Sequence, residues 1–240
     1  GDRMIDMGFE DQLLQILDAM PQSQLKSADP RVAAEQERKI AGDERDRRSL
    51  LRTTVLFSAT MPPAVEKLAN KYLRNPATIY VGEAGKTVDR IKQVVEFVKG
   101  EADKKRRLQE LLQTGPKPPI IVFMNHKKAC DVIAKFVERL GFIAVVLHAG
   151  KSQEAREWAI TEFKERNADV LVATNVAGRG LDVKGVTHVI NFDLPDNIEE
   201  YTHRIGRTGR AGMDGLATSF LTQNDEKIMA PLRALLQKTN

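Results

Sequence analysis

The feature that most constrains the fold is a regular alternation of short apolar segments and longer amphipathic segments through residues 93–238. Continuous apolar runs are typical of strands buried on both faces, and the longer segments carry apolar residues at helical spacing. This alternation predicts a doubly wound α/β fold with a parallel sheet. The strands are expected at 93–98, 120–124, 144–147, 170–173, 186–191 and 217–221, and the helices at 104–113, 127–140, 153–166, 198–203 and 225–238.

Residues 1–82 follow a different pattern. An amphipathic helix is expected to end at Pro21, and a second to run from Pro62 through Leu73, since proline is tolerated in a first helical turn. Between them, residues 22–52 mix charges of both signs without an apolar stripe, which indicates a solvated insertion, partly helical or disordered. Two short strands are expected at 53–57 and 78–81.

Composition excludes some classes of protein and leaves others open. The net charge is +4, which is compatible with nucleic-acid binding without establishing it. The single cysteine, Cys130, rules out an internal disulfide and a cysteine-based zinc site, and its helical pattern predicts a small core residue. We therefore expect a reducing compartment. No apolar run approaches membrane-spanning length, so no membrane association is expected.

The segment His203–Arg210 is the strongest candidate for chemistry. It spaces three arginines at intervals of three, with glycines between them. A guanidinium is permanently charged and its planar fork suits phosphate oxygens, while glycine lets the backbone approach a ligand closely. The segment therefore predicts a device that holds the charge of a phosphoryl-transfer reaction. Taken alone, it could equally be a solvated basic loop.

Two further stretches favour the chemical interpretation, Ala173–Asp182 and Ser58–Thr60. Together with His203–Arg210, and in this order, they resemble motifs V, III and VI of superfamily 2 helicases, specifically the DEAD-box RNA helicases. Asp2–Met4 is similar to the end of the Asp-Glu-Ala-Asp box, 121–125 to motif IV and 153–156 to the family's Gln-x-x-Arg motif.

The resemblance implies a RecA-like doubly wound fold. Residues 1–82 would be the C-terminal portion of a first RecA-like, ATP-binding domain that carries the insertion 22–52. Residues 83–89 would be a linker, and 90–240 a complete second RecA-like domain, with each motif at the carboxyl ends of strands. The chain contains no Gly-x-x-x-x-Gly-Lys-Thr phosphate loop, so we expect it to be a piece of the enzyme and inactive alone.

The same resemblance assigns candidate catalytic and nucleotide-binding residues. Arg207 and Arg210 would contact the γ-phosphate, and Asp182 the ribose. His203 would bridge toward the hydrolytic site of the first domain, to which Asp2 would belong. Asp182 could instead be a turn former, and His203 a satisfied core histidine.

The resemblance also assigns an RNA-binding set and a coupling set. The first would line the RNA backbone, and the second would couple hydrolysis to strand separation. The alternatives are a surface cation on a helix for the RNA-binding arginine and a helix cap for the coupling hydroxyls. The RNA-binding set is Arg156, Thr174, Gly180 and Arg179, the last of which could serve either ligand, and the coupling set is Ser58, Ala59 and Thr60.

These motifs imply an ATP-dependent RNA helicase that unwinds short duplexes, using ATP with Mg²⁺ and no metal site of its own. The segments 61–66, 85–86 and 127–131, with the charged insertion, resemble the spliceosomal subgroup that acts in 5′ splice-site handover. This implies a nuclear, monomeric motor with RNA and spliceosomal proteins as partners. Alternatives are a catalytically inactive RNA-binding or scaffolding relative, a helicase of another RNA process, and a DNA-directed helicase.

The chain departs from the family pattern at two positions. Asn175 stands where the family usually has aspartate, which removes a charge, and Ala149 stands where a second glycine is common. The local contacts of Asn175 cannot be inferred from the resemblance.

Overall fold

The computed structural model describes residues 9–20, 27, 29–41, 52, 54–58, 61, 63–73, 76–79, 90–175, 183–210 and 212–239. The chain divides into two compact units, Gly1–Ala84 and Gly85–Asn240, and each is described by itself.

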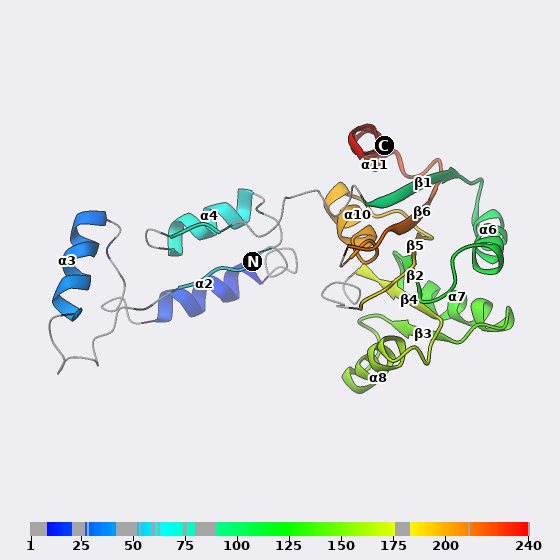
Figure 1. The fold of residues 1–240 in the computed structure, drawn as a ribbon, viewed down its shortest axis with the longest axis horizontal. Coiled ribbons are helices and arrows are strands. Elements are labelled where there is room, and N and C mark those ends of the chain that lie inside the picture. Colours follow the sequence, from blue (N-terminus) through cyan, green and yellow to red (C-terminus); the bar gives the residue numbers. More distant parts are fainter. Residues whose placement is uncertain are drawn as a thin grey trace. The chain divides into compact units, whose positions relative to one another are not determined.

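The second unit is built on one sheet of six parallel strands (Figure 1). Their order across the sheet is β1-β6-β5-β2-β4-β3. All five residues of the central strand β2 are buried, whereas the edge strand β3 alternates between buried and half-buried residues. This difference follows from position, because a central strand of a parallel sheet is covered on both faces. The strands are β1 Ile91–Phe97, β2 Ile120–Met124, β3 Ala144–Leu147, β4 Val170–Thr174, β5 His188–Asn191 and β6 Gly215–Leu221.

Helices cover both faces of this sheet, which makes it doubly wound (Figure 1). Side chains of α6 (Glu101–Thr114) and α7 (Lys127–Arg139) pack on one face, around Leu108 and Ile133. Side chains of α8, α10 and α11 pack on the other face, around the fully buried Phe163 and Tyr201. These three helices are Gln153–Lys164, Ile198–Ile205 and Glu226–Thr239.

The expected α/β class and parallel sheet are confirmed. The expected strands and helices of this unit are present, β2 and β3 with the expected bounds and the others with shifted ends. Cys130 is buried on α7, as expected for a core residue, and burial raises the pKa of its thiol to about 12. None of the helices that the structure describes is long and apolar enough to cross a membrane.

The described part of the first unit contains three helices, α2 (Glu10–Ala19), α3 (Pro30–Ala41) and α4 (Pro63–Tyr72). Leu17 of α2 packs with Leu68 and Tyr72 of α4. The expected helix after Pro62 is therefore confirmed, and the charged insertion contains the helix α3.

The two strands expected in the first unit are wrong for the residues that the structure describes. Thr54–Phe57 and Thr78–Ile79 are not in strands. Phe57 and Ile79 are 83% and 82% exposed. An apolar segment becomes a strand only when a neighbouring strand pairs with it, and the sheet described for this protein lies wholly in the second unit.

Candidate functional site at the strand ends and the arginine segment

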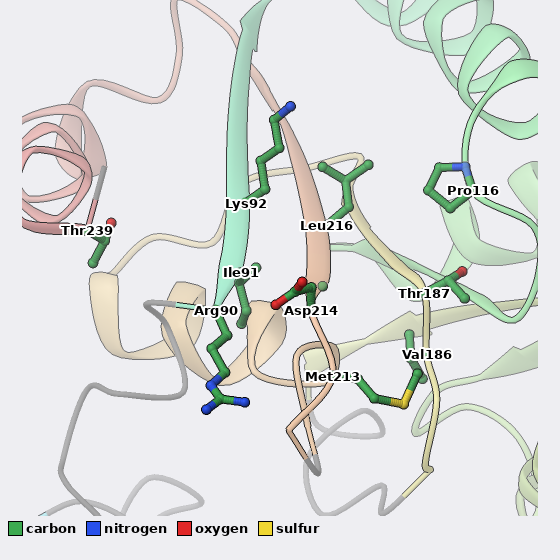
Figure 2. Close-up of a pocket in the computed structure, with 11 residues that line it drawn as sticks. Arg90, Ile91, Lys92, Pro116, Val186, Thr187, Met213, Asp214, Leu216 and Thr239 are labelled. Atoms are coloured by element: carbon green, nitrogen blue, oxygen red, sulfur yellow. The ribbon is translucent and has the colours of Figure 1, made fainter.

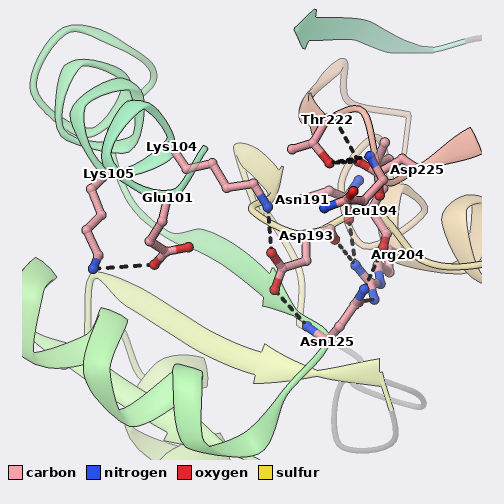
Figure 3. Close-up of polar contacts among 11 residues, drawn as sticks. Glu101, Lys104, Lys105, Asn125, Asn191, Asp193, Leu194, Arg204, Thr222 and Asp225 are labelled. Atoms are coloured by element: carbon pink, nitrogen blue, oxygen red, sulfur yellow. Dashed lines mark hydrogen bonds and ion pairs between the residues drawn. The ribbon is translucent and has the colours of Figure 1, made fainter. Parts of the chain in front are cut away.

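Arg204 on α10 joins the carboxyl ends of three strands (Figure 3). Its Nη2 donates to Asn125 Oδ1 at 2.7 Å, just after β2, and its Nη1 donates to the Asp193 carbonyl at 2.6 Å, after β5. Its Nε donates to Asn175 Oδ1, at the end of β4. The guanidinium also lies over the Phe123 ring, 5.3 Å from its centroid. The residue is only 3% exposed, so these bonds hold α10 in one position against the sheet.

Asp193 extends this network toward α6. Its carboxylate accepts from Lys104 Nζ at 2.7 Å and from the Asn125 backbone N–H at 3.1 Å. The Asn125 side chain in turn donates to the Leu194 carbonyl at 2.7 Å. Lys104 is nearly buried, so this ion pair lies in a region where charge interactions are stronger than in water. The loops after β2 and β5 are thereby fixed to each other.

Asn175, which stands where the family usually has aspartate, uses both polar atoms of its side-chain amide. Its Oδ1 accepts from Arg204, and its Nδ2 donates to Glu200 Oε2. The amide bridges a cation and a carboxylate, both on α10, which an aspartate could not do because it has no N–H to donate. The chain thus ties the end of β4 to α10 with an amide.

Arg207 and Arg210 follow α10 and are both anchored at the base of the side chain. Arg207 Nε donates to the His203 carbonyl at 3.1 Å, and Arg210 Nε donates to the Gly206 carbonyl at 2.7 Å. Both side chains are half-buried. Anchored guanidinium groups of this kind are suited to a phosphate because less side-chain freedom is lost on binding.

The position of this segment corrects one expectation. We expected every motif at the carboxyl ends of strands, but within the segment His203–Arg210 the contacts to that edge described above come from Arg204. Thr208 is buried and donates to the Val186 carbonyl at 2.6 Å, before β5 begins. A Cβ at Gly215, the first residue of β6, would lie 2.5 Å from Thr208 Oγ1 and from the Gly209 nitrogen. The chain must return to the amino edge before β6 starts, so the second half of the motif lies against that edge.

His203 supplies a polar atom that lacks a partner. Its Nε2 is buried, and no group in the described part of the chain bonds to it. A buried polar nitrogen without a partner costs free energy, so such atoms often mark sites where another group binds. The His203 carbonyl already anchors Arg207, which places the ring nitrogen and the arginine on the same turn.

The structure describes some of the remaining predicted site residues. Thr174 is the last residue of β4 and precedes Asn175. Arg156 on α8 donates from Nη2 to Gln153, and its Nε is buried without an acceptor among the described residues. Ser58 belongs to the first unit and is half-buried. The predictions on Asp2, Ala59, Thr60, Arg179, Gly180 and Asp182 lie outside the described residues.

Sequence reasoning missed most of the network around Arg204. Arg204 itself lay inside the recognised motif, but we assigned it no role. The signal that could have revealed its partners is their place directly after three buried strands, where ligands and polar networks collect in such sheets. No cluster of three or more histidine, cysteine, aspartate or glutamate side chains that could hold a metal occurs among the described residues. The missed residues are Lys104, Asn125, Asp193, Arg204 and Asn191, whose Oδ1 accepts from Arg204 Nη1 at 3.5 Å.

Comparison with known proteins connects this geometry to a family. The family model described as the helicase conserved C-terminal domain matches residues 103–212. The ATP-dependent RNA helicase ddx23 of Dictyostelium discoideum is 58% identical over 239 residues, which are 100% of this chain and 28% of that protein. The chain thus spans less than a third of this relative.

Solved structures give the same result. The RNA helicase Prp28 from Chaetomium thermophilum, bound to ADP, is 43% identical with a TM-score of 0.59, over 99% of this chain and 50% of that one. The C-terminal domain of the DEAD-box protein Dbp5 is 34% identical with a TM-score of 0.58, over 64% of this chain and 89% of that one. The chain therefore belongs to the DEAD-box family of RNA helicases.

Proposed function

We propose that the chain is part of an ATP-dependent helicase that separates short RNA duplexes during pre-mRNA splicing. Residues 90–240 would be its second RecA-like domain, and residues 1–82 the C-terminal part of its first, joined by a linker at 83–89. The observation that carries the proposal is the anchoring of Arg207 and Arg210, both through Nε, on a segment that Arg204 fixes to three strand ends.

The two arginines would stabilise charge on a phosphoryl group. ATP with Mg²⁺, bound mainly by the part of the first domain that holds the phosphate loop, would supply the group to be transferred. In such reactions catalysis is largely positioning and electrostatic stabilisation, so arginines with little remaining freedom suit the task. His203 Nε2, buried without a partner in the described residues, fits a further polar contact at this site. Asp2 and Asp182 would complete the hydrolytic site and the ribose contact.

RNA would bind through its backbone. Arg156 and Thr174, with Gly180 and Arg179, would line the phosphates, and Ser58, Ala59 and Thr60 would couple hydrolysis to strand separation. The buried Arg156 Nε, which has no acceptor among the described residues, supports a ligand at this position. Phosphate recognition does not depend on base identity, so we expect low sequence selectivity.

The names of the relatives support the cellular setting. Relatives at 47–58% identity are RNA helicases, and several of them are named as pre-mRNA-splicing enzymes, such as prp-28 of Neurospora crassa. We infer from them a nuclear protein that works as a monomeric motor with RNA and spliceosomal proteins.

The test compares the complete protein with its Arg207→Ala variant. RNA-stimulated ATP turnover should fall by about 10³–10⁵-fold in the variant, the range known for arginine fingers, while RNA binding persists. Arg207→Lys should rescue poorly, because a point charge cannot reproduce the planar fork. Near-normal turnover in Arg207→Ala would contradict the proposed role.

Two controls separate the alternatives. RNA binding without turnover in the unmodified protein would identify a scaffolding relative, and stimulation by DNA rather than RNA would identify a DNA-directed helicase. The 240-residue chain alone should show no turnover above background, since its sequence has no phosphate loop.

A further inference from the structure

We propose that a groove along the amino edge of the sheet binds an acidic, extended peptide segment of a partner protein. The groove consists of two cavities of about 750 and 540 Å³, which share Thr187 and Met213 in their lining. All lining residues belong to the second unit. We call these two cavities together the amino-edge groove.

The sheet order makes the two cavities neighbours. The first lies where β1 and β6 begin, beside Arg90 and Gly215, and the second lies before β2 and β4, beside Pro119 and Asp169. Thr187 precedes β5, which lies between β6 and β2 in the sheet. The groove therefore crosses the ends of five adjacent strands, and Figure 2 shows the part next to β1 and β6.

The charge of this groove favours an anionic occupant. Arg90 and Lys92 line the first cavity, and Lys184 the second. Lys92 and Lys184 form no ion pair with any residue that the structure describes. Two acids also line the groove, Asp214 in the first cavity and Asp169 in the second. Asp169 already accepts a backbone N–H from Ile143 at 2.8 Å.

The apolar lining favours a peptide over a nucleic acid. The half-buried Leu216 and the 55% exposed Met213 offer contact area for aliphatic side chains. Contacts to phosphates alone would leave this apolar surface uncovered, and no aromatic residue lines either cavity to stack on a base. A segment that alternates carboxylates with aliphatic residues would satisfy both the cations and the apolar surface.

Arg166 adds an observation from the backbone. It follows α8 with φ of 67°, in the left-handed region, and the Asn167 N–H bonds to the Glu162 carbonyl at 2.9 Å in the pattern of a helix-terminating turn. Glycine is the usual residue there, because other residues are strained. Here an arginine occupies the position and donates to the Lys184 carbonyl at 2.8 Å on the groove wall. Its charge also offsets the negative end of α8, so Arg166 contributes less to the charge of the groove than the other three cations do.

The experiment uses the 240-residue chain and a fluorescein-labelled peptide, Glu-Leu-Asp-Glu-Ile-Asp-Glu-Leu, with the Gln/Asn version as its uncharged counterpart. The acidic peptide should bind and the uncharged one should not. The double variant Lys92→Glu/Lys184→Glu should weaken binding about 5- to 30-fold, from the loss of two exposed ion pairs. The matched control Lys135→Glu/Lys227→Glu reverses two exposed lysines outside the groove and should change binding less than twofold.

A second variant separates binding from folding. Arg166→Gly relieves the left-handed strain but removes the bond to the Lys184 carbonyl, so it should leave thermal stability nearly unchanged while it weakens peptide binding. Equal losses in the groove pair and the control pair would overturn the proposal, since binding would then be general charge attraction. So would the absence of binding at millimolar peptide. Displacement of the peptide by oligouridine, with the same dependence on Lys92 and Lys184, would assign the groove to nucleic acid and also overturn it.

Discussion

Truncation of Arg204 should destabilise the second unit more than loss of almost any other charged side chain. In Arg204→Ala, three part-buried acceptors, Asn125 Oδ1, Asn175 Oδ1 and the Asp193 carbonyl, lose the donor supplied by a residue that is only 3% exposed. Each buried acceptor left without a partner costs ~1–3 kcal/mol, and removal of one partner from a buried charged network typically costs ~3–5 kcal/mol in all. We therefore expect the unfolding free energy of Arg204→Ala to be ~3–5 kcal/mol lower than that of the unaltered chain. Arg204→Lys should recover only part of it, because one ammonium cannot span three acceptors.

The measurement is thermal and urea unfolding of the 240-residue chain, followed by far-UV circular dichroism. The only tryptophan, Trp158, is 60% exposed, so its fluorescence would report little of the core. A loss of ~3–5 kcal/mol corresponds to a fall in the Tm of roughly 6–20 °C for a unit of this size. Arg106→Ala is the control, because Arg106 pairs with Asp103 on the surface of α6 and should matter little. A fall for Arg204→Ala no larger than that of Arg106→Ala would refute the reasoning.

Three other variants test separate parts of the structure. Arg156→Ala should weaken RNA binding by the complete protein without changing ADP affinity, measured by fluorescence titration. Asn175→Asp should lower the unfolding free energy by ~1–3 kcal/mol at pH 7, because the new carboxylate meets Glu200 where an amide N–H now donates, and adding Glu200→Gln should restore it. Burial lowers the pKa of His188 from 6.5 to about 4, so below pH 6.5 the unfolded chain binds a proton that the folded chain does not. The unfolding free energy should therefore fall between pH 6.5 and 4, and urea titrations of His188→Gln should show a shallower fall.

The architecture of the second unit was predictable because its signals are local and agree with one another. β2 and β3 have the bounds expected from the run of apolar residues, and the ends of the other elements shifted by a few residues. β5 begins at His188 rather than at Val186, whose apolar side chain continued the run. Hydrophobicity does not distinguish a residue that pairs in the sheet from one that leads into it.

The prediction of two strands in the first unit was wrong for the described residues, because a local sequence pattern does not show whether a pairing partner is present. Thr54–Phe57 has the composition of a buried strand, yet these residues do not lie in a strand. A strand is a property of two segments, and the prediction rested on the apolar composition of one segment alone. Local composition can therefore propose a strand without establishing it.

The candidate site shows the same limit at the level of side chains. The segment His203–Arg210 was recognisable from its sequence. The sequence did not show that Arg204 is buried while Arg207 is half-exposed, because this depends on how α10 is oriented. Because α10 packs on the sheet with Tyr201 inward, the next position one turn on, Arg204, also turns inward and is buried, and Arg207 and Arg210 remain half-exposed. The burial that separates Arg204 from the half-exposed Arg207 and Arg210 is set by helix phase and by three strand ends that lie far apart in the sequence. A motif can therefore indicate a site, but only the packing of α10 shows which of its arginines is buried.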